Sequence, residues 1–284
     1  TSRRQRQMCI RDRFMSRNSN WNERELTLAL ALYYRVPATK ISGTNPMLKD
    51  ASAYIGRSSS AIAFKLANFR AIDRKAGEGP RGFSHGSRTD TEVMERFLDP
   101  DSGSVDLEKL SDAVQSIFGA VCSPVDKSHA LEVILGVDIL PEIRKTEAVS
   151  IVKRRVGQGY FRNAVLANCG NTCLISHCRT PELLEAAHIV SWSAGEADRL
   201  TIGNGIALNP FFHEAYDKNF MGISPDGTVE FAESLKQRST EFWDNFLEPL
   251  EGIKIDLDTR TPINKEFLSL HYQEFRAGKF DVGF

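Results

Sequence analysis

The second half of the chain holds two histidines and an asparagine at positions suited to acid–base chemistry. His188 ends a short apolar run, Asn204 precedes a glycine, and His213 lies near the start of a predicted helix. A histidine can take a proton from water near neutral pH, because its intrinsic pKa lies there. An asparagine amide can bridge two backbone segments without adding charge. Together these residue types fit the hydrolysis of a phosphodiester, in which a positioned base activates water.

A negatively charged substrate of that kind also calls for a cation. His213 and Asp217 are four residues apart, so on a helix they share one face and can both approach a metal ion. A divalent cation there would offset the charge that builds up on the phosphate and on the leaving oxygen. Taken singly, a histidine is more often structural, and an Asn-Gly pair is an ordinary turn signal. The ordered set of residues is what carries the interpretation.

The surrounding sequence predicts the elements that would hold these residues. Short strands are expected around 183–190 and 205–208, and a helix is expected to begin near Asn209-Pro210. Ser224-Pro225-Asp226-Gly227 indicates a turn between two further strands, and helical stretches are expected near 234–245 and 265–278. The order strand, strand, helix is typical of the ββα-metal nucleases.

On these residues the chain resembles the HNH endonuclease superfamily, in particular the branch found among bacterial restriction and defence nucleases. The resemblance runs from about Arg155 to Phe231. Its motifs are the lead-in Arg155-Val156-Gly157-Gln158-Gly159-Tyr160-Phe161-Arg162, Cys173, Glu185-Ala186-Ala187-His188-Ile189, Asn204-Gly205, and His213 through Asp217. The resemblance implies that His188 is the general base, Asn204 a positioning residue and His213 a metal ligand. The implied activity is metal-dependent cleavage of DNA in a restriction or anti-phage system.

One position departs from the pattern of the superfamily. Many members carry an aspartate immediately before the base histidine, where it binds the metal, and this chain has Ala187 there. Asp217 is then the candidate for the second ligand, and Glu185 is the reserve. A site with few protein ligands suits Mg²⁺, which keeps several of its waters, with Mn²⁺ as the alternative.

Three cysteines ahead of the first predicted strand raise the question of a zinc site. No cysteine follows Cys178, so two paired cysteine knuckles cannot be built from Cys169, Cys173 and Cys178. A three-cysteine site completed by His177 would be crowded. We therefore expect buried or free thiols here.

The first half of the chain predicts helices. Three are expected between residues 21 and 74, with a break at Gly43-Thr44-Asn45-Pro46 and a stop at Gly56. Asn22 is the expected cap of the first helix, and the serines that follow Arg57 are expected to cap the third. A helix, a short glycine turn and a second helix form the outline of a helix-turn-helix.

Basic residues outnumber acidic ones in the stretch that includes the third helix. Arg57, Lys65 and Arg70 are the candidates for contacts with DNA phosphates, because basic side chains on such a helix suit the phosphate backbone and the major groove. The alternative is a helical module that binds a protein partner or an effector.

The whole chain has the composition of an ordinary soluble protein, with 41% hydrophobic residues, 26% charged residues and a net charge of −1. We find no apolar run of about 18 residues, so we expect no membrane span. Five scattered cysteines suit reduced thiols and a cytoplasmic location.

We predict an α+β protein with a helical N-terminal module and a C-terminal ββα-metal nuclease domain. The expected divisions are a non-native or disordered tail at 1–14, a DNA-binding module at 20–97, a helical linker region at 98–145 and the nuclease domain at 146–284. The expected partner is DNA, with a homodimer left open. A non-catalytic DNA-binding protein is the alternative from another functional class.

Overall fold

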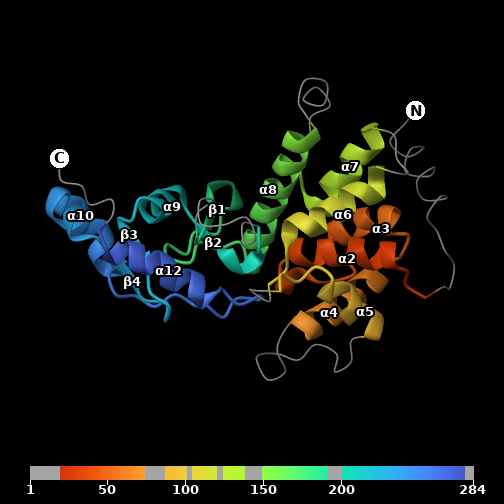
Figure 1. Ribbon diagram of the computed structural model, residues 1–284, viewed down its shortest axis with the longest axis horizontal. Helices are drawn as coiled ribbons and strands as arrows, with labels where there is room; N and C mark the ends of the chain where they lie inside the picture. Colours follow the sequence, from red (N-terminus) through yellow and green to blue (C-terminus); the bar gives the residue numbers. More distant parts are fainter. Residues whose placement is uncertain are drawn as a thin grey trace.

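The computed structural model describes residues 20–73, 87–100, 104–119, 124–137, 149–190 and 200–278. Two lobes lie side by side along the long axis of the molecule, with helix α8 (Val149–Asn168) between them (Figure 1). The helical lobe comprises α2 to α7 and most of α8, and the C-terminal lobe comprises the elements from β1 onward. The α+β prediction is confirmed. Within the described residues, no helix is long and apolar enough to cross a membrane.

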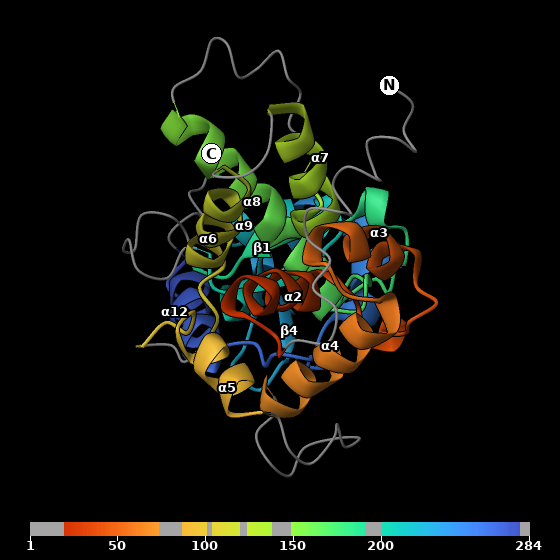
Figure 2. The ribbon, with the colours of Figure 1, turned by 90° about the vertical axis from the view of Figure 1, so that its right-hand side faces the viewer.

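The helical lobe is a bundle built around α2 (Glu23–Arg35). Every residue of α2 from Glu25 to Tyr34 is buried, as expected for a helix that is apolar on nearly all sides. Figure 2 shows α2 at the centre of this lobe with the other helices around it. These are α3 (Pro46–Ile55), α4 (Ser59–Asp73), α5 (Arg88–Glu95), α6 (Leu107–Gly119) and α7 (Pro124–Leu135), together with α8 and the single turn η1 (Ala38–Lys40).

Local signals in the sequence account for the ends of these helices. The Asn22 side chain accepts a hydrogen bond from the Glu25 backbone in a capping box, as its position predicted. Pro46 occupies the first turn of α3, and Gly56 ends that helix in the left-handed conformation with φ 84°. Ser58 caps α4 by accepting a hydrogen bond from a backbone N–H in its first turn.

The buried side chains form two hydrophobic cores. The first includes side chains of α6 and α7, so the segment 98–145, expected as a linker, packs inside the helical lobe where it is described. It also includes α8 residues from Val156 to Val165, whereas the second core begins at Leu166. The two cores therefore meet within α8, and α8 is shared by both lobes.

The C-terminal lobe contains the predicted strand–strand–helix unit. Strand β1 (Glu185–His188) pairs antiparallel with β2 (Gly205–Leu208), with His188 opposite Gly205, and α9 (Pro210–Asp217) follows. A second two-stranded sheet pairs β3 (Met221–Ile223) with β4 (Val229–Phe231). The remaining elements are η3 (Pro181–Leu183), η4 (Ile202–Asn204), α10 (Glu233–Arg238), α11 (Thr240–Phe242), the π-helical turn η5 (Trp243–Leu247), η6 (Glu248–Leu250) and α12 (Lys265–Arg276).

A buried arginine ties the C-terminal lobe to the central helix. Arg260, which is 4% exposed, donates hydrogen bonds to the carbonyl oxygens of Tyr33, Tyr34 and Val36 at 2.7 to 2.9 Å. These carbonyls lie at the C-terminal end of α2, where a helix leaves its last carbonyl groups without helical partners. The guanidinium also lies 4.5 Å from the centre of the Tyr33 ring. Arg260 therefore fixes the position of one lobe against the other.

Candidate active site

Asn204 clamps the segment that follows His188. It is 1% exposed, its Oδ1 accepts a hydrogen bond from the Val190 N–H at 2.9 Å, and its Nδ2 donates to the Val190 carbonyl at 3.3 Å. The Ile189 N–H in turn donates to the Asn204 carbonyl at 3.0 Å. The side-chain amide thus links its own segment, at the entrance to β2, to the backbone of Val190, just beyond the end of β1.

His188 lies at the end of β1 and against helix α8. Its imidazole stacks on the ring of Phe161, with ring centroids 4.4 Å apart and planes 9° apart. Gly205, opposite His188 in the strand pair, permits this close approach. A Cβ at position 205 would lie 2.3 Å from Val165 Cγ2 and 2.9 Å from Phe161 Cζ. The glycine of the Asn-Gly pair is therefore required by helix packing, whereas the sequence pattern alone indicates only a turn.

His213 stands between two carboxylates. Its Nδ1 lies 2.6 Å from Glu185 Oε2, and its Nε2 lies 3.3 Å from Asp217 Oδ2. The hydrogen bond to Asp217, helped by the one to Glu185, raises the pKa of His213 to about 9, although partial burial acts in the opposite direction. All three side chains are partly exposed. The helical spacing predicted that His213 and Asp217 share one face of α9 beside a metal ion; in the structure the two side chains contact each other directly, and Glu185, the reserve ligand, contacts the other ring nitrogen.

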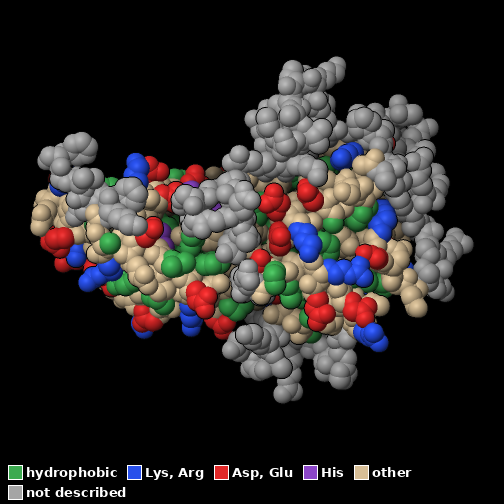
Figure 3. Space-filling model, in the orientation of Figure 1, with side chains coloured by type: hydrophobic (Ala, Val, Ile, Leu, Met, Phe, Trp, Pro, Cys, Tyr) green, Lys and Arg blue, Asp and Glu red, His purple; other side chains and the backbone are tan. Residues whose placement is uncertain are grey.

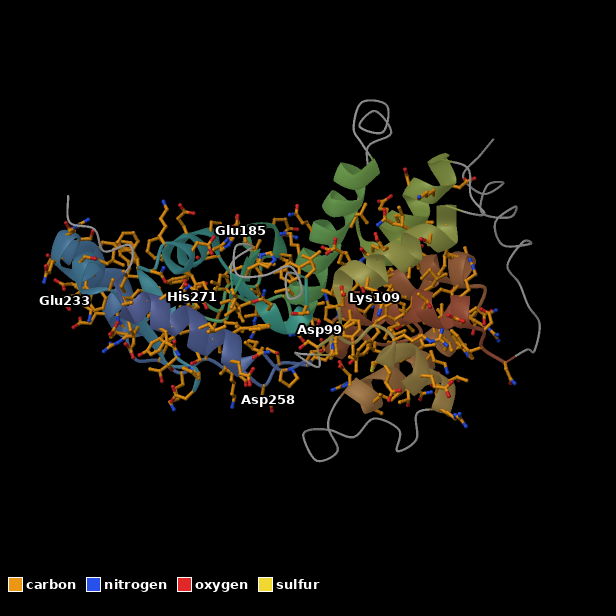
Figure 4. All side chains as sticks on the ribbon, viewed as in Figure 1. Asp99, Lys109, Glu185, Glu233, Asp258 and His271 are labelled. Carbon is orange, nitrogen blue, oxygen red and sulfur yellow. The ribbon has the colours of Figure 1, made fainter. Side chains whose placement is uncertain are left out.

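The two faces of β1 explain why Glu185 reaches His213. Side chains alternate along a strand, so Glu185 and Ala187 lie on one face and Ala186 and His188 on the other. Ala187 is buried in the second core, whereas Ala186 packs against the first. Glu185, two residues before Ala187, therefore lies on the same face of β1. An acid at position 187 would point to that face as well. Figure 4 labels Glu185 in the C-terminal lobe, on β1.

Helix α9, which carries His213 and Asp217, is held at both ends. The Asn209 side chain caps it by accepting a hydrogen bond from the Phe212 N–H at 3.0 Å, and Pro210 occupies its first turn. Toward its other end, the Tyr216 ring stacks on His271 of α12 with centroids 3.6 Å apart. His271 Nε2 donates to the Tyr216 carbonyl at 3.1 Å. Burial lowers the pKa of His271 and so favours its neutral form.

Two of the residues expected to contact DNA, Lys65 on α4 and Arg57 just before it, form ion pairs inside the helical lobe, and their contact with DNA stays a prediction. The Lys65 ammonium is 6% exposed and lies 2.7 and 2.9 Å from the two carboxylate oxygens of Asp90. Arg57 forms an ion pair with Glu25 at 2.7 Å. Both cations lie 5.1 Å from the centre of the Trp21 ring. Each cation thus has a carboxylate partner close by, which leaves less of its charge for phosphates.

Few of the remaining residues of the predicted basic stretch are described by the structure. Arg70 is half-buried in the last turn of α4, and Arg74, Lys75 and Arg81 lie outside the described residues. On the face shown in Figure 3, lysines and arginines of the helical lobe are interspersed with aspartates and glutamates. The helical lobe therefore offers phosphates no concentrated positive charge on that face.

The cysteines near β1 contribute to packing. Cys169 and Cys173 are buried in the second core, and burial raises the pKa of Cys169 to about 12. The Cys173 N–H donates to the Cys178 carbonyl at 2.9 Å and closes the loop between them. Within the described ranges, no group of three or more His, Cys, Asp or Glu side chains is arranged to hold a metal ion.

Comparison with known proteins agrees with this geometry. Residues 173–224 match the model of a family described as HNH endonuclease. The matched segment begins at Cys173 and contains β1, β2 and α9, and with them His188, Asn204, His213 and Asp217. No curated protein matches the chain. The C-terminal part of this chain is therefore an HNH endonuclease domain, a domain of nucleases that hydrolyse phosphodiester bonds.

Proposed function

We propose that the domain cleaves DNA with the help of a bound divalent metal ion, with His188 as the general base. The observation that carries this proposal is the clamp between Asn204 and Val190, which holds the His188 strand in register with a rigid, uncharged bridge. A general base must be held within hydrogen-bonding reach of the water that it activates, and a fixed strand end provides that. Asn204 is accordingly the positioning residue.

His213 would hold the metal together with one of its two carboxylate neighbours. A ligating histidine usually donates its other ring N–H to a carboxylate, which orients the ring and increases its basicity. Asp217 at Nε2 and Glu185 at Nδ1 fit these two parts. We assign Asp217 to the metal and Glu185 to the orienting hydrogen bond. With two protein donors, Mg²⁺ or Mn²⁺ would keep several waters, and the ion would supply charge neutralisation at the phosphate.

The two carboxylates can be told apart by metal affinity. In Glu185→Gln an amide oxygen can still accept the hydrogen bond from Nδ1. The affinity for Mn²⁺ should therefore fall by about 10-fold or less, the smallest loss usual for a residue that hydrogen-bonds to a metal ligand. Asp217→Asn removes a charged ligand and should cost more than about 100-fold. Glu214→Gln, also on α9 and exposed, is the matched control and should change nothing. Calorimetric titration of the full chain gives the answer, and the reverse order would make Glu185 the ligand.

The base assignment is tested with His188→Ala. Cleavage should fall by about 10²- to 10⁴-fold, the usual cost of losing a general base, while DNA binding is retained. The assay uses plasmid DNA with Mg²⁺, Mn²⁺ or a chelator. Near-normal cleavage by the variant would remove His188 from the mechanism, and cleavage undiminished by a chelator would remove the metal.

We propose a restriction or anti-phage role for the nuclease, on the ground of its resemblance to that branch. Parallel plasmids that differ only in base modification provide the test, because a restriction nuclease distinguishes them. Equal cleavage of all of them would count against this role.

A second candidate concerns the helical lobe, which we infer binds a protein partner or an effector. The ion pairs of Lys65 with Asp90 and of Arg57 with Glu25 favour this over phosphate contact by α4. Substrate choice would then lie in the nuclease domain or in the partner. Binding of DNA by a fragment that ends before β1, with a steep salt dependence, would contradict this inference.

A further inference from the structure

The imidazole of His188 has a flat, buried neighbour. Phe161 is 2% exposed, and its ring lies parallel to the imidazole within 9°. Rotation of an imidazole about its Cβ–Cγ bond has broad, shallow minima, because this torsion joins a tetrahedral carbon to a planar one. A parallel ring against one face removes that freedom, because any rotation drives an edge of the imidazole into the Phe161 ring.

Phe161 is itself held from both sides by its neighbours in α8. The Tyr160 hydroxyl donates to the Ala31 carbonyl of α2 at 2.8 Å, which ties this turn of α8 to the centre of the helical lobe. Arg162 donates to the carbonyls of Pro181 and Leu184 at 3.0 and 2.8 Å, which ties the same turn to the segment entering β1. The backbone of Phe161 is thereby fixed with respect to the strand that carries His188.

We propose that Phe161 is a positioning residue for DNA cleavage, which sets the plane of the His188 ring and so aims its proton-accepting nitrogen at the attacking water. The inference rests on the proposed role of His188 as general base. Phe161 need not touch the substrate for this purpose. Its loss should therefore reduce the rate of the chemical step and leave substrate binding nearly unchanged.

The first test is the proton NMR spectrum of the native protein. A proton on a ring stacked over an aromatic face is shifted upfield, so the Cε1–H resonance of His188 should lie upfield of an ordinary histidine. His188→Ala identifies this resonance by its disappearance. Phe161→Leu, which keeps an apolar side chain but removes the flat face, should move the resonance downfield. A native His188 signal at an ordinary position would overturn the proposal.

The second test is kinetic. Phe161→Leu should lower kcat by about 10-fold or more, since small misplacements of a catalytic group have effects of that order, and should change KM less than about twofold. Phe161→Met is the second variant if the leucine variant folds poorly. Tyrosine is not a conservative replacement, because Phe161 Cζ faces Gly205 and has no room for a hydroxyl. Phe69→Leu, in the same core but away from His188, is the matched control.

The outcomes separate the two proposals. A native kcat in Phe161→Leu with a shifted His188 resonance would reduce Phe161 to core packing. An equal loss of kcat in Phe69→Leu would assign the effect to general destabilisation and also overturn the inference. Native cleavage by His188→Ala would instead refute the base assignment, whatever the spectra show of the stacking.

Discussion

Replacing Asn204 tests whether the clamp on the His188 strand has the value that its geometry implies. Asn204→Ala removes the hydrogen bonds with the Val190 N–H and carbonyl at 2.9 and 3.3 Å, in a position that is 1% exposed. A hydrogen bond contributes about 1 kcal/mol net, and more when the partner is left unsatisfied. We therefore expect the free energy of unfolding to fall by about 2 kcal/mol.

The aspartate variant sharpens the test, because it is nearly isosteric. In Asn204→Asp, one oxygen can still accept from the Val190 N–H, but the other faces the Val190 carbonyl where Nδ2 now donates. Two acceptors would then oppose each other in a buried position, and the charge would be poorly solvated. Asn204→Asp should therefore destabilise the protein at neutral pH by at least as much as Asn204→Ala. Asn204→Asp should also reduce the rate of DNA cleavage by about as much as Asn204→Ala does.

The assay is urea unfolding at neutral pH, followed by plasmid cleavage under conditions in which every variant is folded. Asn245→Ala is the control, since Asn245 makes an exposed hydrogen bond to the Glu241 carbonyl. Its loss should change stability by less than about 0.5 kcal/mol. If Asn204→Asp were as stable and as active as the native protein, the clamp would not position His188 and the argument would fail.

Four further predictions follow from the same structure. Gly205→Ala should cost about 1–3 kcal/mol and reduce cleavage, because its Cβ would overlap Val165 and push α8 away; an unchanged unfolding curve would contradict this. Lys65→Met should cost about 3–5 kcal/mol, because it leaves Asp90 buried without its cation, yet the salt dependence of DNA binding should not change. A flatter salt dependence would return Lys65 to the DNA interface. Arg260→Met should cost about as much, because it leaves buried helix carbonyls without donors, and thermal unfolding measures it. Burial lowers the pKa of His271 below its ordinary 6.5. The contribution of neutral His271 to the free energy of unfolding is therefore complete above pH 6.5 and is lost as pH falls through the lowered pKa. His271→Phe, which can keep the stack on Tyr216, should flatten the pH dependence of stability below about pH 6.5, and parallel curves would show that another group is responsible.

Local structure and the order of the site residues could be predicted from the sequence because they depend on neighbours in the chain. The capping box at Asn22, the left-handed stop at Gly56 and the turn before β4 all follow from interactions within a few residues. That His213 and Asp217 share one helix face follows from helical spacing in the same way. The bridging role of Asn204 could also be expected, because strand, strand, helix is a compact unit with short connections.

Other features were decided by the tertiary structure, because they join residues that no spacing rule connects. The burial of Lys65 was not predicted, because its partner Asp90 lies on another helix and supplies a buried carboxylate. The described helices of segment 98–145 contribute to the first core because α2 is apolar on nearly all sides and needs helices all around it.

At the site, residues far apart in the chain complete the environment of each histidine. Glu185 reaches His213 because it shares a strand face with Ala187, and Phe161 reaches His188 because Gly205 lets α8 approach. The sequence alone determined which residues can do chemistry and in which order they follow one another. Packing of α8 and α9 against β1 decided which neighbours orient those residues, because side-chain contacts between separate elements depend on distances that exist only in the folded chain.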